Sequence, residues 1–370
     1  MRLLYVAHGY TTHDWRFLNA LQSDGFDVHY LPLYPVRMDQ RPLPSGVTPV
    51  PWVGDRLPEG QAFGMARRWL ALRKVLNGLR PHVALAGPVP TAAFLLALAG
   101  FAPFVAMSWG SDLLVDANRS RAVGAKAGYA LRRAAGFFGD CQAVAREARR
   151  RASFPDDRVV VFPWGIDPRQ FFPAPSETHL RRDLGWEGKR VLICTRTWEP
   201  LYAVDVLVRA FAGVVTEFPD ARLLLVGDGS RAAEINGLID DLGVRDRIHA
   251  PGRVAYDRLP DLFRLADLYV SPALSDGTSV SLLEAMACGR PAIATNAYGN
   301  VEWVRPAENG WLADPGSVES LAGCLRKALA APAERLAAMG RANTAVTRER
   351  ADWDRNFPRL GELLRQVARS

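Results

Sequence analysis

Short apolar runs alternate with segments of helical periodicity along most of the chain. The run Leu3–Ala7 precedes apolar residues at helical spacing between Trp15 and Leu21, and a second run follows at Val28–Leu31. Apolar runs bounded by turn residues indicate buried strands, and strands that alternate with helices predict a parallel sheet. Further strands are expected at Val83–Ala86, Phe104–Ser108, Gly136–Phe138, Val159–Phe162, Val191–Thr195, Leu223–Val226, Ile248–His249, Leu268–Ser271 and Ala292–Ala294. The pattern predicts an α/β protein with two Rossmann-like, doubly wound domains.

Helices are expected where apolar residues recur at helical spacing. These segments are Phe63–Leu79, Val204–Val215, Leu259–Leu265, Ser279–Cys288, Ser317–Ala330 and a single terminal helix over Arg348–Val367. Residues 32–60 are rich in Pro and Gly, which indicates an irregular loop. We expect an N-terminal domain over 1–170, a second domain over 171–350 and the terminal helix over 351–370, with a linker at Pro173–Pro175.

The most apolar stretch, Ala92–Met107, is shorter than the ~20 residues of a membrane span, and Gly100 and Pro103 interrupt it. The apolar run at the start of the sequence is too brief for a secretion signal. The four cysteines are scattered, without the spacing of a zinc site or of a disulfide framework. With 49% hydrophobic and 23% charged residues, the 370-residue chain has the composition of a soluble globular protein. We therefore expect a cytoplasmic protein, either free or peripheral on the membrane.

The net charge of +7 is concentrated in one part of the chain. Residues 60–151 hold 14 Lys and Arg against 4 Asp and Glu, whereas residues 173–370 hold 25 against 26. In the helix expected at Phe63–Leu79, apolar positions such as Trp69 oppose Arg and Lys positions. An anionic bilayer or a phosphorylated acceptor would suit this region, and so would a solvated, Arg-rich surface. Because the basic residues are not interleaved with aromatic ones, we expect no nucleic-acid partner.

The segment Ser275–Pro291 joins an expected strand to an expected helix. A helix start presents unpaired N–H groups and a partial positive charge, and Gly277 lets the backbone approach a ligand, so a diphosphate suits this place. Asp276 and Glu284 flank the site and are suited to binding the paired hydroxyls of a ribose or a sugar ring. The alternative is an ordinary helix start with solvated carboxylates. A diphosphate between two hydroxyl-binding acids describes a nucleotide-sugar site.

The same segment resembles the Glu-x7-Glu signature of the retaining glycosyltransferases of family 4, which have the GT-B fold. Asp276 replaces the first Glu, and the residues that match are Glu284, Ala285, Met286, Ala287, Gly289 and Pro291. The resemblance implies two domains facing across a cleft, with the terminal helix crossing back to the N-terminal domain. It also implies retaining transfer of a hexose-type sugar from a UDP- or GDP-type sugar to a glycan, a lipid-linked glycan or a small molecule. No metal and no further cofactor are expected.

The resemblance also assigns roles to single residues. Arg196 follows a strand and is expected to grip the diphosphate, while Tyr202 stands at or near the position of a family lysine. Asp276 is expected to orient the donor sugar and Glu284 to hold the ribose diol. The expected donor-binding residues are Gly9, Gly227, Gly252, Arg253, Val254, Gly277, Thr278, Ser279, Val280 and Glu284. The segment 227–232 also fits a dinucleotide fingerprint, but no acid stands ~20 residues further on, so we reject that interpretation.

The resemblance is looser in the first half of the chain. Trp109 stands where the family often has a His that contacts the donor sugar, whereas Asp112 matches the family. His13 follows the first strand, and an ordinary polar residue at a helix start would explain it equally well. We take His13, Trp109, Asp112 and Tyr202 as candidates for the sugar or acceptor cleft. A nucleotide-sugar epimerase or phosphorylase of the same fold is one alternative, and a non-catalytic nucleotide-sugar-binding protein is another.

Overall fold

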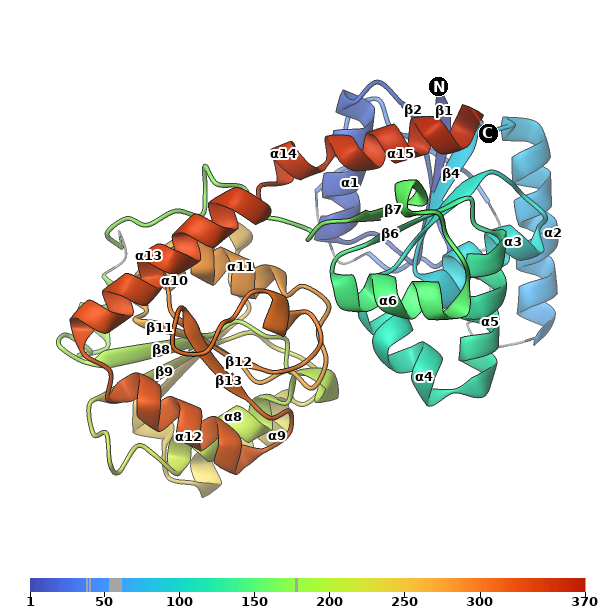
Figure 1. The fold of residues 1–370 in the computed structure, drawn as a ribbon. Helices are drawn as coiled ribbons and strands as arrows, with labels where there is room; N and C mark the ends of the chain where they lie inside the picture. Colours follow the sequence, from blue (N-terminus) through green and yellow to red (C-terminus); the bar gives the residue numbers. More distant parts are fainter. Residues whose placement is uncertain (38, 40, 53–61, 177–178, 370) are drawn as a thin grey trace. The chain divides into compact units, whose positions relative to one another are not determined.

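The chain forms two compact units in the computed structural model (Figure 1). The first unit comprises Met1–Trp164 and Asp354–Ser370, and the second unit comprises Gly165–Trp353. The structure describes residues 1–37, 39, 41–52, 62–176 and 179–369, without the side chains of residues 62 and 63. The irregular loop expected at 32–60 and the start of the basic region 60–151 thus lie partly outside the described residues.

The first unit is built on a parallel sheet of seven strands in the order β3-β2-β1-β4-β5-β6-β7. The strands are β1 (Arg2–Ala7), β2 (Asp27–Pro32), β3 (Thr48–Pro49), β4 (Val83–Ala86), β5 (Phe104–Met107), β6 (Gly136–Gly139) and β7 (Val159–Val161). In β1, Leu3 lies opposite Val28 of β2 on one side and Val83 of β4 on the other. Helices cover both faces of this sheet, so its central strands are buried throughout (Figure 1).

The helices of the first unit are tied to the ends of these strands. They are α1 (Thr12–Ser23), α2 (Ala62–Leu79), α3 (Phe94–Leu98), α4 (Ala117–Arg119), α5 (Arg121–Arg133), α6 (Gln142–Arg151) and α15 (Pro358–Arg369), with short turns η2 (Val89–Ala93), η3 (Asp112–Asp116) and η4 (Asp156–Arg158). α1 begins with a capping box formed by Thr11 and Asp14. Tyr5 of β1 donates to the same Asp14 carboxylate at 2.9 Å, which fixes α1 on the sheet. α15 packs against β4 and β5.

The second unit has six parallel strands in the order β10-β9-β8-β11-β12-β13. They are β8 (Arg190–Cys194), β9 (Ala221–Val226), β10 (Ile248–Gly252), β11 (Leu268–Ser271), β12 (Ala292–Thr295) and β13 (Gly310–Ala313). The helices are α7 (Leu180–Asp183), α8 (Val204–Ala212), α9 (Ala232–Asp241), α10 (Leu259–Leu265), α11 (Val280–Ala287), α12 (Val318–Leu329) and α13 (Ala333–Arg350), with turns η5 (Pro200–Tyr202), η6 (Arg245–Arg247), η7 (Tyr256–Arg258) and η8 (Asn300–Glu302). The strand order is that of a Rossmann sheet, so the prediction of two doubly wound domains is confirmed.

The single terminal helix expected over Arg348–Val367 is wrong. α13 ends within that range, and a short helix α14 (Trp353–Asn356) and α15 follow separately. The backbone of Ile166 explains the break, because its N–H donates to the Ala351 carbonyl at 2.8 Å and its carbonyl accepts from the Trp353 N–H at 3.3 Å. These bonds hold the segment extended, and Pro358 then starts the next helix, where its missing N–H costs nothing.

The chain passes from the first unit to the second at Trp164 and Gly165, slightly before the boundary expected at 170 and 171. Phe171 already packs against Phe263 in the second core, with 6.2 Å between ring centroids. The expected linker at 173–175 therefore lies inside the second unit. None of the helices in the described ranges combines the length and apolar character needed to cross a bilayer.

Candidate active site

The second sheet reverses its direction of growth between β8 and β11. β8, β9 and β10 follow one another on one side, whereas β11, β12 and β13 follow one another on the other. In open parallel sheets, ligands bind beyond the carboxyl ends of the strands at this point of reversal. Arg196 follows β8 at that edge, and the loop 272–279 that contains Asp276 follows β11. The fold thus brings the two predicted residues together at the place where a ligand is expected.

Arg196 is the centre of a buried polar cluster, with only 8% of its surface exposed. Its Nη1 donates to Ser279 Oγ at 2.6 Å and to Ser281 Oγ at 3.3 Å. Its Nη2 lies 2.9 Å from Asp276 Oδ2, which makes an ion pair. The guanidinium carbon also lies 4.2 Å from the centre of the Tyr202 ring, a cation–π contact. Within the described residues, the remaining Nε–H has no hydrogen-bond partner, so one donor of the fork is unused.

Burial and the ion pair act together on the pKa values of Arg196 and Asp276. Burial raises the pKa of Asp276, and the nearby Arg196 and the Ser279 hydroxyl oppose this shift. Burial by itself would lower the pKa of Arg196, but the Asp276 carboxylate and other neighbours outweigh it, so that this pKa lies above its ordinary value. A close ion pair favours both charged forms. The ion pair therefore offsets part of the cost of burying the two groups.

The helix α11 begins beside this cluster. Ser279 is its N-cap, because Ser279 Oγ accepts from the Leu282 N–H at 3.3 Å. Ser281, in the first turn, also lies 2.8 Å from the hydroxyl of Tyr269 in β11. Burial raises the pKa of Tyr269 to about 12, so this hydroxyl keeps its proton at neutral pH. The start of α11 and the guanidinium of Arg196 add their positive potential at one place.

Glu284 lies one turn beyond Ser281 on the same side of α11. The side chain is buried, with 2% exposed, and its Oε1 accepts from the Tyr256 hydroxyl at 2.8 Å. Tyr256 stands in η7, which follows β10, and is itself 41% exposed. A buried carboxylate held at the edge of the surface by a hydroxyl donor is suited to accepting hydroxyl groups from a ligand.

Two glycines after β9 allow two loops to touch. A Cβ at Gly227 would lie 2.6 Å from the Arg196 carbonyl, and a Cβ at Gly229 would lie 2.5 Å from the Trp198 carbonyl. The Trp198 N–H donates to the carbonyl of Asp228 at 3.0 Å. The glycine pair thus fixes the loop that carries Arg196, and its predicted contact with a nucleotide stays a prediction.

The loop before α11 is clamped in a similar way. A Cβ at Gly299 would lie 1.8 Å from the Gly277 carbonyl oxygen, and the Gly299 N–H donates to the Asp276 carbonyl at 3.2 Å. No side chain fits at position 299 unless the loop moves. Thr278 is buried in this loop with 4% exposed. The backbone that positions Asp276 is therefore held from two sides.

The residues expected to line the nucleotide base follow β10. Gly252 has a φ of +79°, which favours glycine, and its carbonyl accepts from the Gly227 N–H at 2.9 Å. Arg253 is exposed, and Val254 packs partly against the core. The structure thus joins the loops after β9 and β10. Contact of Gly252, Arg253 and Val254 with a base stays a prediction.

Two family models match the chain: "Glycosyl transferases group 1" over residues 176–346 and "Glycosyltransferase Family 4" over residues 8–170. The GDP-mannose-dependent alpha-(1-6)-phosphatidylinositol monomannoside mannosyltransferase of Mycolicibacterium smegmatis is 29% identical over 60% of each chain. The N-acetyl-alpha-D-glucosaminyl L-malate synthase of Bacillus anthracis is 34% identical over 42% of this chain and 40% of its own. The chain therefore matches only about half the length of these relatives.

The fold of HepE from Anabaena, solved with UDP and glucose, superposes with a TM-score of 0.81 at 21% identity, covering 99% of this chain and 100% of that one. The chain belongs to the family 4 glycosyltransferases and has the GT-B fold. The resemblance inferred from residues 275–291 is thereby confirmed.

In the first unit, His13 lies in an aromatic cluster. Its ring stacks on Trp164 at 5.8 Å between centroids and meets the edge of Trp109 at 6.1 Å. Phe17 packs on the same Trp164 at 4.8 Å. Burial, together with a smaller effect of Arg16, lowers the pKa of His13 to about 4, so the imidazole is neutral at pH 7. His13 and Trp109 thus lie together in an aromatic cluster in which the imidazole carries no charge at pH 7.

Asp112, in contrast, is engaged by its own chain. Its carboxylate accepts from the Val89 N–H at 2.8 Å, the Ser108 hydroxyl at 2.6 Å and the Trp109 N–H at 2.9 Å. Burial raises the pKa of Asp112. Asp112 thus holds the Trp109 backbone in place, and this structural role accounts for an Asp at this position.

Packing accounts for Gly9, because a Cβ there would lie 2.5 Å from the Val36 carbonyl oxygen in the loop after β2.

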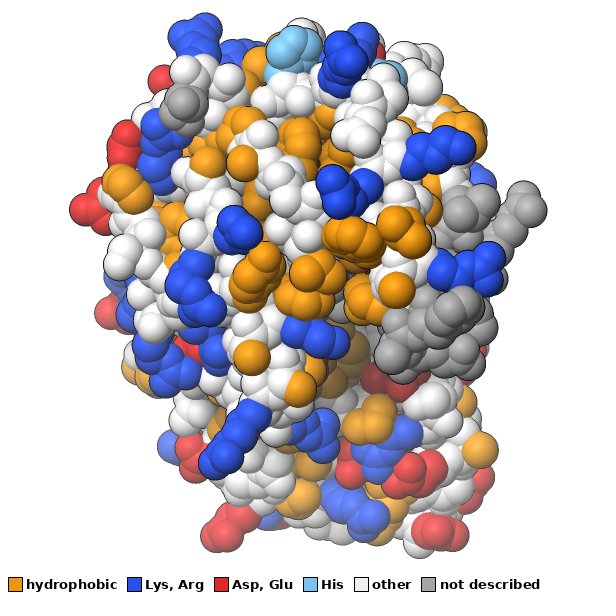
Figure 2. Space-filling model, turned by 90° about the vertical axis from the view of Figure 1, so that its right-hand side faces the viewer, with side chains coloured by type: hydrophobic (Ala, Val, Ile, Leu, Met, Phe, Trp, Pro, Cys, Tyr) orange, Lys and Arg blue, Asp and Glu red, His pale blue; other side chains and the backbone are white. Residues whose placement is uncertain are grey.

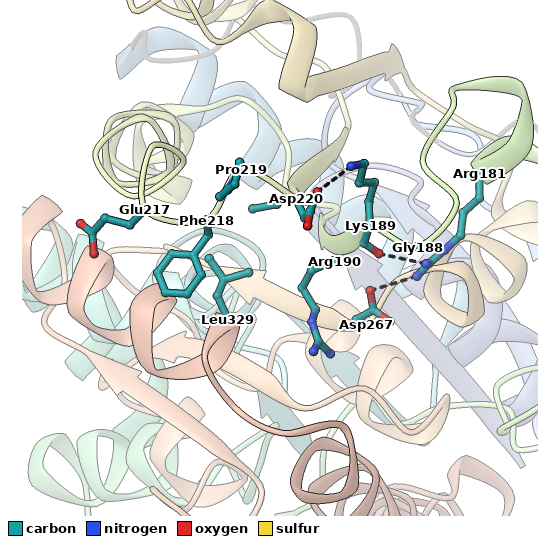
Figure 3. Close-up of a pocket in the computed structure, with 11 residues that line it drawn as sticks. Arg181, Gly188, Lys189, Arg190, Glu217, Phe218, Pro219, Asp220, Asp267 and Leu329 are labelled. Atoms are coloured by element: carbon teal, nitrogen blue, oxygen red, sulfur yellow. Dashed lines mark hydrogen bonds and ion pairs between the residues drawn. The ribbon is translucent and has the colours of Figure 1, made fainter.

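A cavity of about 490 Å³ lies at the opposite edge of the second sheet, where β8, β9 and β11 begin (Figure 3). Four of its charged side chains form two ion pairs: Lys189 lies 2.5 Å from Asp220, and Arg181 lies 3.0 Å from Asp267. In Figure 3, the partners within each of these two pairs point toward one another. We assign this cavity no part in the active site.

Several residues of the site have no signal in the sequence. Ser281 and Tyr256 contact Arg196 and Glu284, but each stands in a segment whose pattern indicates only a helix or a turn. The hydroxyls of Thr195, Ser271 and Ser275 are buried at the same sheet edge without a hydrogen-bond partner among the described residues. The only sequence signal for these three hydroxyls is that small polar residues stand at or after the ends of two apolar strands.

Proposed function

We propose that this family 4 glycosyltransferase transfers a hexose-type sugar from a nucleotide-diphosphate sugar to an acceptor hydroxyl, with retention of the anomeric configuration. The observation that carries the proposal is the buried Arg196 at the switch point, next to the start of α11. A planar guanidinium and helix N–H groups are the donors that suit a diphosphate. The unused Nε–H of Arg196 and the buried hydroxyls of Thr195 and Ser275 supply further donors at this edge.

The residues then divide the work as follows. When the bond between the sugar and the diphosphate breaks, negative charge grows on the diphosphate oxygen, and the preorganised Arg196 fork stabilises it. Asp276 holds the Arg196 guanidinium through the 2.9 Å ion pair. The same carboxylate orients the donor sugar by accepting hydrogen bonds from the hydroxyls of the sugar. Glu284 binds the ribose diol in exchange for, or beside, the Tyr256 hydroxyl. Cations and backbone dipoles carry the charge, so neither a metal ion nor a further cofactor is part of the proposal.

The donor we propose is of the UDP or GDP type. GDP-mannose is in the name of one relative, and UDP is bound in a protein of the same fold. The acceptor we propose is a glycan, a lipid-linked glycan or a small molecule, and phosphatidylinositol monomannoside and malate in the relatives' names support the last two classes. We place the reaction in the cytoplasm, where four reduced cysteines are expected.

A thermal-shift screen of nucleoside diphosphates and their sugars tests the donor class. A ligand at one hundred times its dissociation constant adds about 2.7 kcal/mol to the free energy of unfolding, so one base should raise the midpoint clearly above the others. Incubation of that donor with and without acceptors then distinguishes transfer from epimerisation, which needs no acceptor. NMR of the product reports the anomer. Stabilisation by no nucleotide would exclude the proposal, and activity that a chelator abolishes and manganese restores would exclude its metal-free form.

A further inference from the structure

The first unit carries an unusual outer face on α2, α3 and α5. α3 contacts both neighbouring helices, so the three form one continuous surface. Together they contain eight Lys and Arg and no Asp or Glu. Figure 2 turns this side of the molecule toward the reader and shows hydrophobic side chains gathered in the middle of the face, with Lys and Arg side chains around them.

Aromatic side chains link the three helices at this face. The Trp69 indole N–H of α2 donates to the Leu98 carbonyl at the end of α3, at 3.0 Å. One turn earlier in α3, the Phe94 ring meets the Tyr129 ring of α5 edge to face, with 5.9 Å between centroids. Leu70 is 59% exposed and Leu98 is 39% exposed beside these rings. The centre of the face is therefore an apolar and aromatic strip.

Each ring of the strip has a cation next to it. The Arg73 guanidinium lies 5.2 Å from the centre of the Trp69 ring, and the Lys126 ammonium lies 5.7 Å from the centre of the Phe94 ring. Arg133 donates from Nε to the Tyr129 hydroxyl at 3.0 Å. These contacts place the three cations beside the rings of the strip. We name the face formed by Trp69, Leu70, Arg73, Lys74, Phe94, Leu98, Lys126, Tyr129, Arg132 and Arg133 the aromatic-basic face.

We propose that the aromatic-basic face docks on an anionic lipid bilayer. Amphipathic rings with a polar tip favour the level of the lipid head groups, exposed leucines enter the acyl boundary, and a rim of cations meets the phosphates. Because α2, α3 and α5 contain no Asp or Glu, these helices do not bring the repulsion that an acidic residue would cause. An acidic protein or polysaccharide would account for the cations but not for leucines exposed at the centre. The inference rests on the first unit alone and does not depend on the proposed reaction.

The test is flotation of the full chain with vesicles of phosphatidylcholine, with and without a quarter of phosphatidylglycerol. We expect binding to the anionic vesicles only, and loss of most of it when salt rises from about 0.1 M to about 1 M, where the screening length falls from about 10 Å to 3 Å. Each cation near a bilayer is worth about fivefold in partitioning, so the triple variant Arg73→Gln/Lys74→Gln/Arg133→Gln should bind about a hundredfold more weakly. The exposed pair Leu70→Ser/Leu98→Ser should lose about tenfold.

A matched control changes the same number of charges elsewhere. Arg182→Gln/Arg335→Gln/Arg341→Gln removes three exposed arginines of the second unit and should bind anionic vesicles as the unmodified chain does. Equal losses in both triple variants would overturn the assignment to this face, and equal binding to neutral vesicles would overturn the role of charge. Retention on heparin–agarose that is indifferent to the leucine substitutions, combined with no flotation, would mean a soluble polyanion and would also overturn the proposal. Unchanged unfolding midpoints confirm that the variants are folded.

Discussion

The ion pair between Arg196 and Asp276 allows the structural and catalytic parts of the arginine to be separated by mutation. Arg196→Ala removes the hydrogen bonds to Ser279 and Ser281 and the 2.9 Å contact with Asp276, and leaves that carboxylate buried. Taking one partner from a buried ion pair costs about 3–5 kcal/mol. In the double variant Arg196→Ala/Asp276→Asn the orphaned charge is gone, so we expect about 2 kcal/mol of the free energy of unfolding to return.

The stability of Arg196→Ala should also depend on pH. Burial already raises the pKa of Asp276, and loss of the guanidinium removes the main group that opposes this shift. A carboxyl whose pKa is raised in the folded state binds a proton there first, so it destabilises the fold increasingly as pH rises through that folded pKa. The deficit of Arg196→Ala relative to the unmodified chain should therefore be smaller at about pH 5 than at about pH 8. The double variant should lack this difference.

Activity should not follow stability. Loss of one preorganised donor to a developing oxyanion lowers kcat about 10²–10³-fold, so the single variant should turn over the donor that slowly. The double variant, which also lacks the Asp276 carboxylate, should be at least as slow. Urea unfolding measures the first quantity and sugar transfer from the donor identified by the thermal screen measures the second. Arg182→Ala, whose side chain is 65% exposed, is the control for loss of an arginine charge. Recovery of turnover in the double variant would refute the reasoning, because Arg196 would then act only by neutralising Asp276.

Three further substitutions test other parts of the site. The folded pKa of His13 is about 4, below its ordinary value of about 6.5, so the unfolded chain takes up the proton first as pH falls. The free energy of unfolding should therefore drop by up to about 3 kcal/mol between about pH 6.5 and about pH 4. His13→Phe should lack this pH-dependent loss when its urea midpoints at about pH 5 and about pH 7.5 are compared. Gly299→Ala should lower the free energy of unfolding by about 2 kcal/mol and the rate of sugar transfer about tenfold, because its Cβ would lie 1.8 Å from the Gly277 oxygen. Gly237→Ala is the control: the space around its Cβ is open, so it should change neither urea unfolding nor transfer. Glu284→Gln should weaken binding of the preferred nucleoside diphosphate about tenfold or more, as measured by calorimetry. Inhibition by inorganic diphosphate should stay unchanged, because only a contact with the ribose is lost. An equal effect on both ligands would contradict the ribose role.

The fold and the position of the site follow from local patterns in the sequence. Strands such as Leu268–Ser271 are apolar runs with sharp ends, and the loop–helix transition after it contains Gly277 and a capping serine. Because parallel strands present their carboxyl ends at one edge, Arg196 and Asp276, which each follow such a strand, lie together there. Short-range periodicity is sufficient for this much because each element forms from its own residues.

Contacts made by distant residues could not be predicted in this way. The ring on which His13 stacks belongs to Trp164, at the end of the segment Met1–Trp164. The hydroxyl that donates to Glu284 comes from a turn 28 residues earlier in the sequence. The break between α13 and α15 likewise depends on a bridge to Ile166, although the apolar spacing of residues 348–367 alone favours one helix. Tertiary hydrogen bonds outweigh local propensity at that point.

The first unit consists of two stretches of chain, since Met1–Trp164 is completed by Asp354–Ser370. During synthesis at about 5–20 residues per second, the ribosome must make the whole second unit before α15 emerges, a delay on the order of ten to forty seconds. Until then the surface of β4 and β5 that α15 covers has no partner. The nascent chain thus spends this interval with an apolar sheet face open to chaperones or to neighbouring polypeptides, while the continuous second unit is free to fold first.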